Sequence, residues 1–102
     1  KRLISMPSNV HRVRVERRPS THLIRGAKIN MEPVISFSSQ GLYVTAVKLT
    51  NLQNEKVTMD PRNIRGNWLT ATFQHALLGE TGTDNDTTSL YLISDRPFWE
   101  SF

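Results

Sequence analysis

Short stretches in which hydrophobic and polar residues alternate account for most of this chain. The clearest covers residues 42–50, where one side of the pattern holds Tyr43, Thr45, Val47 and Leu49. A period of two residues is typical of a β-strand. Because apolar residues also occupy the other side of this stretch, we expect a central strand rather than an edge strand.

Weaker alternation predicts the other strands. They are expected at residues 10–17, 21–25, 34–38, 56–60, 68–75 and 88–94, with loops at 26–32 and 76–87. Clusters of Gly, Ser, Asn and Asp between them favour turns. No stretch of ten residues keeps the 3.6-residue period of a helix. The pattern therefore predicts an all-β fold, an antiparallel β-sandwich of six to eight short strands in a single domain.

The length and the ends of the chain suggest how it is organised. A chain of 102 residues has room for one modest core. Residues 1–9 show no period and begin with Lys1 rather than Met, so we expect a linker that leads in from a missing N-terminal region. The β-sandwich domain is then expected over residues 10–102. No apolar run approaches about 20 residues, so no membrane-spanning helix is expected in this piece.

The sequence between two of the predicted strands indicates a sharp corner. Pro61 presets its own φ, and the carboxylate of Asp60 can accept hydrogen bonds from amides just ahead of it. Gly66 provides a position where a positive φ costs little, and the large apolar Trp68 is expected to start the next strand. We assign to this structural corner Asp60, Pro61, Arg62, Gly66 and Trp68.

Positive charge is concentrated at the start of the chain. Residues 1–28 hold eight Lys and Arg against the single acid Glu16, a net +7, and the rest holds five Lys and Arg against eight acids, a net −3. Such a region suits an acidic partner surface or a phosphate backbone. It equally suits a solvated edge strand that Arg side chains protect from aggregation.

Residue types that carry catalysis or bind metals form no recognisable pattern. The chain has no Cys, which removes disulfides and thiolate chemistry. The three His residues are far apart in sequence, and Asp84-Asn85-Asp86 lacks the spacing of a calcium-binding loop. Neither a Gly-x-Ser-x-Gly elbow nor a glycine-rich phosphate loop is present. We therefore expect no catalytic residues, no metal and no cofactor, and we do not expect an enzyme.

Two surface regions are candidates for contacts with other molecules. Arg12 and Arg14 fall on one side of the first predicted strand, but the basic quarter contains no aromatic residue on which bases could stack, which disfavours direct binding of nucleic acid. The apolar tail, residues 98–102, either folds back on the core or docks on a neighbour. The candidate subunit contacts are Arg12, Arg14, Trp99 and Phe102.

Residues 41–98 carry a resemblance to a known family. Its pieces are the run 42–51 (Leu-Tyr-Val-Thr-Ala-Val-Lys-Leu-Thr-Asn), Asp60-Pro61-Arg62, the run 64–75 that begins Ile-Arg-Gly-Asn-Trp-Leu, the run 87–94, and Arg96-Pro97-Phe98. The ordered pair Asp-Pro-Arg and Arg-Gly-x-Trp-Leu is its most specific part. This region resembles the C-terminal part of a family of integrating-conjugative-element proteins, which is similar to the TraK-type, secretin-like component of conjugative type IV secretion systems.

The resemblance implies a non-catalytic structural subunit of a conjugative outer-membrane core complex that serves horizontal DNA transfer. It further implies a periplasmic β-sandwich associated with the outer membrane, assembled as a homo-oligomeric ring. Its partners would be a small outer-membrane lipoprotein and the scaffold subunit that links the inner and outer membranes, bound through strand edges and apolar grooves. The alternatives are a basic β-module that binds single-stranded nucleic acid and a periplasmic adhesion or carbohydrate-binding sandwich.

Overall fold

The computed structural model describes residues 9–102, so most of the expected linker, residues 1–9, lies outside the described residues. The described chain forms seven strands and two short helices. In chain order they are β1 (His11–Val13), β2 (Ile29–Ser39), β3 (Leu42–Asn51), β4 (Val57–Thr58), the 3-10 helix η1 (Pro61–Asn63), β5 (Thr70–Phe73), β6 (Leu77–Leu78), β7 (Thr87–Ser94) and α1 (Phe98–Ser101).

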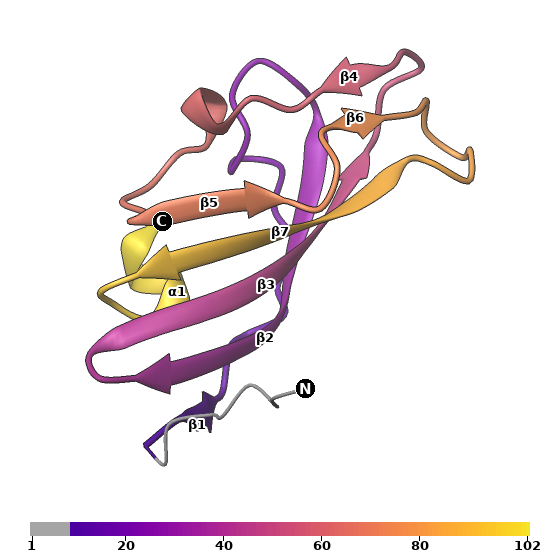
Figure 1. Cartoon of the computed structure of the whole chain (residues 1–102). Helices are drawn as coiled ribbons and strands as arrows, with labels where there is room; N and C mark the ends of the chain where they lie inside the picture. Colours follow the sequence, from indigo (N-terminus) through magenta and orange to yellow (C-terminus); the bar gives the residue numbers. More distant parts are fainter. Residues whose placement is uncertain (1–8) are drawn as a thin grey trace, which may run out of the picture.

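Five of the strands build one antiparallel sheet in the order β1-β2-β3-β7-β5, and β4 pairs with β6 in a second, two-stranded sheet. Figure 1 shows the large sheet running from β1 at the bottom to β5 near the top, with β4 and β6 beside each other at the upper right. β3 lies in the middle of the large sheet, as its apolar residues on both sides predicted. The predicted fold class is confirmed: the protein is all-β, antiparallel and single-domain, with seven strands in residues 9–102.

The core lies on one face of the large sheet. Val47 of β3 pairs with Leu90 of β7, and Leu49 pairs with Met31 of β2, and all four side chains are almost fully buried. The layer that covers them is mostly irregular. It contributes to the same buried cluster Leu23, Ile24, Met59, Leu78 of β6 and Phe98 of α1.

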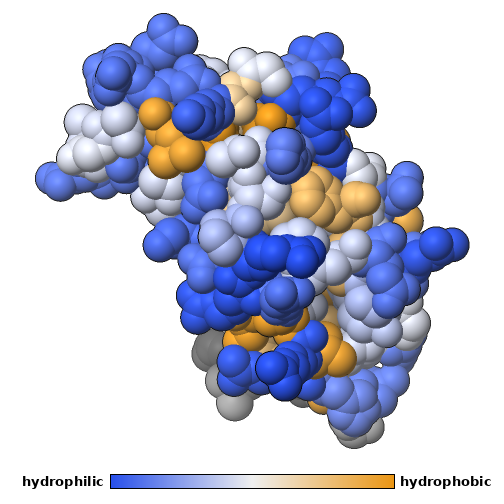
Figure 2. Space-filling view, turned by 180° about the vertical axis from the view of Figure 1, so that it is seen from behind, coloured by the Kyte–Doolittle hydropathy of each residue, from blue (hydrophilic) through white to orange (hydrophobic). Residues whose placement is uncertain are grey.

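The opposite face of the large sheet stays partly exposed. Leu42 and Val44 are each 41% exposed, and Tyr91 of β7 is 43% exposed. On the other side of the molecule, where α1 and the irregular layer cover the sheet, hydrophobic side chains are separated by strongly hydrophilic ones (Figure 2). The seven strands thus form one large sheet with a thin second layer, which is an unequal sandwich.

β2 is longer than the sequence pattern indicated. A loop was expected over residues 26–32 and a strand only at 34–38, but the strand begins at Ile29 and continues through Pro33. The backbone N–H and C=O of Met31 are directed to Ser20, and strand alternation directs those of Pro33 to the same edge. The strand tolerates proline because the missing N–H faces an edge with no regular partner. The register also shifts between Pro33 and Ile35.

β1 is shorter than predicted, since only residues 11–13 of the expected 10–17 are paired, from His11 with Ser38 to Val13 with Ser36. Residues that follow Val13 would have to pair with the part of β2 that contains the bulge and Pro33, which has no N–H to donate. The N-terminal chain therefore leaves the sheet after Val13 and bridges β2 again only where Ser20 meets Met31. The strand expected at 21–25 is likewise reduced to one isolated bridge between Ile24 and Ile64.

The remaining boundaries differ by a few residues. The strands expected at 56–60 and 68–75 are reduced to β4 and β5, so that Trp68 precedes β5 instead of starting it. The loop expected at 76–87 contains β6. Within residues 9–102, the model has no helix with the length and hydrophobicity needed to cross a membrane.

One substitution on each face of the large sheet should distinguish the buried face from the exposed face by the stability that is lost. Leu92→Ala removes a side chain that is 0% exposed, and we expect it to lower the free energy of unfolding by about 2–5 kcal/mol because it leaves a cavity. Leu42→Ala, on the exposed face, should cost less than about 1 kcal/mol. Urea unfolding followed by circular dichroism would measure both values, and equal losses would contradict the assignment of the core to one face.

Candidate docking cleft between the first strand and the C-terminal helix

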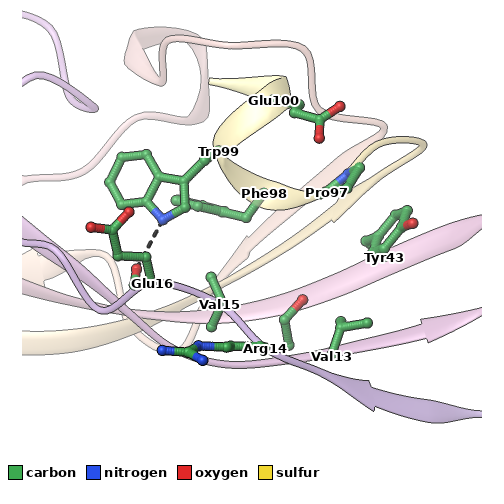
Figure 3. A pocket seen from close by; sticks show the side chains of 10 residues that line it. Val13, Arg14, Val15, Glu16, Tyr43, Pro97, Phe98, Trp99 and Glu100 are labelled. Carbon is green, nitrogen blue, oxygen red and sulfur yellow. Dashed lines mark hydrogen bonds between the residues drawn. The ribbon is translucent and has the colours of Figure 1, made fainter.

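A cleft of about 220 Å³ lies between the N-terminal segment and the C-terminal helix α1. One wall is residues 13–16, the other is residues 97–100, and Ser36 and Tyr43 of the sheet complete the lining. Figure 3 shows Val15 pointing toward Trp99 and Phe98, whereas the Arg14 guanidinium lies on the other side of the chain. Segments near the two ends of the described chain therefore form the two walls of this cleft.

The corner at residues 60–68 holds α1 in place. The backbone N–H of Asn67 donates to the carbonyl of Ser101 at 2.7 Å, and the Trp68 ring stacks on Phe98 with ring centroids 5.3 Å apart. The indole N–H of Trp68 donates back to the carbonyl of Arg65 at 2.6 Å. A partly buried tryptophan with its N–H satisfied is a stable support for a short helix.

Gly66 allows this close approach between the corner and α1. Its φ is +112°, and a Cβ added there would lie 2.7 Å from the Ser101 carbonyl oxygen and 2.7 Å from the indole nitrogen of Trp68. A real Cβ essentially never comes that close to another heavy atom. Glycine is thus required at residue 66 both by its backbone conformation and by the space available.

The start of the corner is fixed by local hydrogen bonds. Asp60 caps η1 by accepting from the backbone N–H of Arg62 at 2.9 Å, and Pro61 occupies the first helical position. The Arg62 side chain also donates to the Asp60 carboxylate at 2.8 Å. The side-chain hydrogen bond from Arg62, followed by the backbone one, lowers the pKa of Asp60 below its ordinary value.

Trp99 links α1 to the N-terminal segment. Its indole N–H donates to the carbonyl of Glu16 at 2.8 Å, and the guanidinium of Arg18 lies 4.1 Å from the ring centroid. Phe98 meets Trp99 edge-to-face at 5.1 Å, and Phe102 lies 5.7 Å from it. The cation–π contact and the hydrogen bond together hold residues 16–18 beside the helix, although this segment has left the sheet.

The size and chemistry of the cleft suit an apolar side chain of a partner. Small-molecule sites usually enclose about 300–1,000 Å³, so this cleft falls below that range. Its walls carry Val13, Val15 and Phe98, with Glu100 among the exposed residues that line it. The hydroxyl of Ser36 is hydrogen-bonded to the hydroxyl of Thr45, with the two oxygens 2.8 Å apart, so the Ser36 hydroxyl does not face a general base. An anchor side chain that enters a rigid pocket is the usual centre of a protein interface.

The structure brings together some of the candidate contact residues. Arg14 and Trp99, which are far apart in sequence, line the same cleft. Arg12 lies in β1 and is exposed, and Phe102, 36% exposed, packs beside Trp99. The tail follows the first of its two expected courses, because Phe98 is only 2% exposed and belongs to the core. Trp99 and Phe102 extend from that buried anchor toward the surface.

Eight lining residues of the cleft were not among the candidate contacts, and they include Val13, Val15, Tyr43 and Pro97. The alternation of residues 10–17 placed both valines on one side, which was the available signal for them. Tyr43 and Pro97 carried no such signal, because their role depends on where α1 folds back.

In the acidic turn before β7, the carboxylate of Asp86 is hydrogen-bonded to residues close to it in sequence. Asp86 accepts from the backbone N–H of Gly82 at 2.9 Å and from the hydroxyl of Thr87 at 2.9 Å, and these bonds lower its pKa. Among residues 9–102, no three His, Asp or Glu side chains gather closely enough to hold a metal ion.

Comparison with known proteins places the chain in one family. A family model described as "Protein of unknown function (DUF3438)" matches residues 1–102. The chain belongs to the DUF3438 family. No curated protein and no solved structure matched it.

The requirement for Gly66 in this DUF3438 chain can be tested with a matched pair of variants. Gly66→Ala and Gly26→Ala both place a Cβ on a residue with positive φ, but only the first brings it against neighbouring atoms. We expect Gly66→Ala to lower the free energy of unfolding by about 1–3 kcal/mol more than Gly26→Ala does, because the clash adds to the backbone strain. Urea unfolding followed by tryptophan fluorescence measures both. Equal losses would mean that Gly66 serves its φ alone.

The Asp60–Arg62 pair should make stability depend on pH. The lowered pKa of Asp60 means that its carboxylate stabilises the folded state above the unfolded-state pKa, about 3.9. This contribution is lost as the pH falls through the folded-state pKa. Asp60→Asn, which keeps a capping oxygen, should lower the melting temperature modestly at pH 7, because Arg62 is highly exposed.

Thermal unfolding from pH 7 to pH 2 would check this expectation. The difference in melting temperature between the natural chain and Asp60→Asn should shrink toward the acid end. Arg62→Gln should have a similar effect, and adding it to Asp60→Asn should change little. A difference that stays constant over the whole pH range would contradict the assigned role of the pair.

Proposed function

We propose that this DUF3438 protein is a non-catalytic structural subunit of the outer-membrane core complex of a conjugative type IV secretion system. In this role it sits in the periplasm at the outer membrane, forms a ring with copies of itself, and binds a small lipoprotein and the scaffold subunit. The resemblance of residues 41–98 to TraK-type proteins motivates the proposal. The all-β fold agrees with the β-sandwich that this resemblance implies.

One structural observation supports a docking role more than any other. Val13 and Val15 from the N-terminal segment and the candidate contact residue Trp99 from α1 line one cleft with apolar walls. The cleft is preformed, because the corner holds α1 and α1 holds residues 16–18. A preformed pocket lowers the entropy cost of association, which favours specific binding of a protein segment.

The nucleic-acid alternative gains less from the structure. Folding does place Trp99 beside the basic segment, so the aromatic residue missing from the sequence there is supplied by the tail. However, Arg18 lies over its ring, and Phe98 and Phe102 pack against it. A ring that is occupied in this way does not offer a free face for base stacking.

Affinity capture would test the proposal. The tagged protein is incubated with an envelope extract of the source cell at roughly 150 mM salt, and bound proteins and nucleic acid are identified. We expect a small lipoprotein or envelope ring subunits that stay bound at high salt, because apolar contacts in the cleft are not screened. Nucleic acid alone, released steeply as salt rises, would contradict the proposal and support the alternative.

Variants then connect the capture to the cleft. Glu100→Lys reverses an exposed charge in the lining, and Trp99→Ala removes one wall. Both should reduce capture of the envelope partner about ten-fold or more, the loss typical of an interface hot spot. Leu77→Ala is the control, since Leu77 is an exposed apolar residue of β6 outside this cleft. Circular dichroism would establish that each variant is folded.

A further inference from the structure

A second cleft lies along the same N-terminal segment, where it has separated from β2. It measures about 410 Å³ and is lined by Arg12, Val13, Arg14, Val15 and Arg17 on one side and by Val34 and Ile35 of β2 on the other. The separation has the cause already given: β2 carries Pro33 and a bulge at this point, so the chain from Arg14 onward has no regular partner. We call this second cleft the arginine cleft.

The arginine cleft carries positive charge that the described chain neutralises only in part. Arg17 forms an ion pair with Glu32 of β2 at 3.3 Å. Arg12 and Arg14 are exposed and have no ion-pair partner among residues 9–102. No acidic side chain is part of the lining. The Arg17–Glu32 pair is therefore an example of a carboxylate bound beside this cleft. The guanidinium groups of Arg12 and Arg14 remain available to bind further carboxylates.

The spacing of the arginines fits an extended peptide. Side chains two residues apart on one side of an extended segment are separated by about 7 Å. Arg12 lies in β1, and Arg14 follows two residues later, just past the end of the strand. An extended segment laid alongside repeats with the same period, so that its residues i and i+2 face the two guanidinium groups.

From these observations we propose that the arginine cleft binds an extended acidic segment of a partner protein. Carboxylates at alternate positions of that segment pair with Arg12 and Arg14, and its aliphatic side chains or stems lie over Val34 and Ile35. This inference rests on the proposed docking function and names the chemistry of a second contact beside the apolar cleft. The valine-lined walls, and an aromatic neighbour whose ring is already occupied, favour a peptide over single-stranded nucleic acid.

A direct binding experiment tests this inference. The probe is a fluorescein-labelled peptide of about ten residues that alternates Glu and Thr, which in extended form is long enough to span the arginine cleft. Binding is followed by fluorescence anisotropy. The comparison probes are the matched Gln–Thr peptide and a single-stranded oligo-dT of similar length. We expect the acidic peptide to bind, and the double variant Arg12→Ala/Arg14→Ala to weaken it about ten-fold or more.

The matched control is Arg25→Ala/Lys28→Ala, which removes the same charge from exposed positions outside the arginine cleft. It should keep most of the affinity. In spectra of the ¹⁵N-labelled protein, the peptide should shift the amide signals of residues 11–17 and 34–36. Equal losses in the two double variants, or equal binding of the Gln–Thr peptide, would overturn the inference, as would no binding at all.

Tighter binding of oligo-dT than of the acidic peptide would also overturn it, in favour of a phosphate backbone. These outcomes can be told apart from failure of the proposed function. Envelope capture that depends on Trp99 and Glu100 but not on Arg12 and Arg14 would leave the docking function in place and remove only the acidic partner.

Discussion

Both walls of the apolar cleft depend on one contact, the hydrogen bond from the Asn67 amide to the Ser101 carbonyl. The two groups can meet because Gly66 has no side chain that would collide with the Ser101 carbonyl. A helix of four residues has almost no stability of its own. α1 is stable because it packs close enough to the corner at residues 60–68 for Trp68 to stack on Phe98. With α1 in place, Trp99 can reach the Glu16 carbonyl, and the N-terminal segment gains a position that the sheet does not provide. One backbone approach at a glycine thus organises both walls of the cleft.

The two clefts use opposite sides of one short segment. Residues 13–15 present Val13 and Val15 to α1, while Arg12 and Arg14 line the gap toward Val34 and Ile35. An alternating segment of this kind normally places its apolar side on a sheet core and its polar side in water. Here the chain leaves the sheet, and each side borders a cavity instead. The two surfaces differ in character: the first favours apolar burial and the second favours charge pairing, so salt should affect them unequally.

Much of the fold could be predicted from the sequence, and much of the site could not. The strands at 42–51 and 87–94 are regular, central and strongly alternating, and their bounds were expected to within one residue. The early strands were misjudged because pairing, not pattern, ended them: Pro33 did not stop β2, whereas it contributed to shortening β1. The valines of the first cleft were visible in the alternation. Tyr43, Pro97 and the position of Arg18 over Trp99 depend on a tertiary fold-back that local patterns do not encode.

The hydrogen bond between Trp99 and Glu16 joins residues separated by 83 positions along the chain. Contacts of such long separation form late, because the intervening chain must first be ordered. During synthesis the first wall emerges well before the second, so the apolar cleft stays incomplete until residues 97–100 have been made. A chain interrupted just after β7 would therefore contain every strand from β1 to β7 and still lack one wall of the cleft, together with the indole that holds the other wall in place.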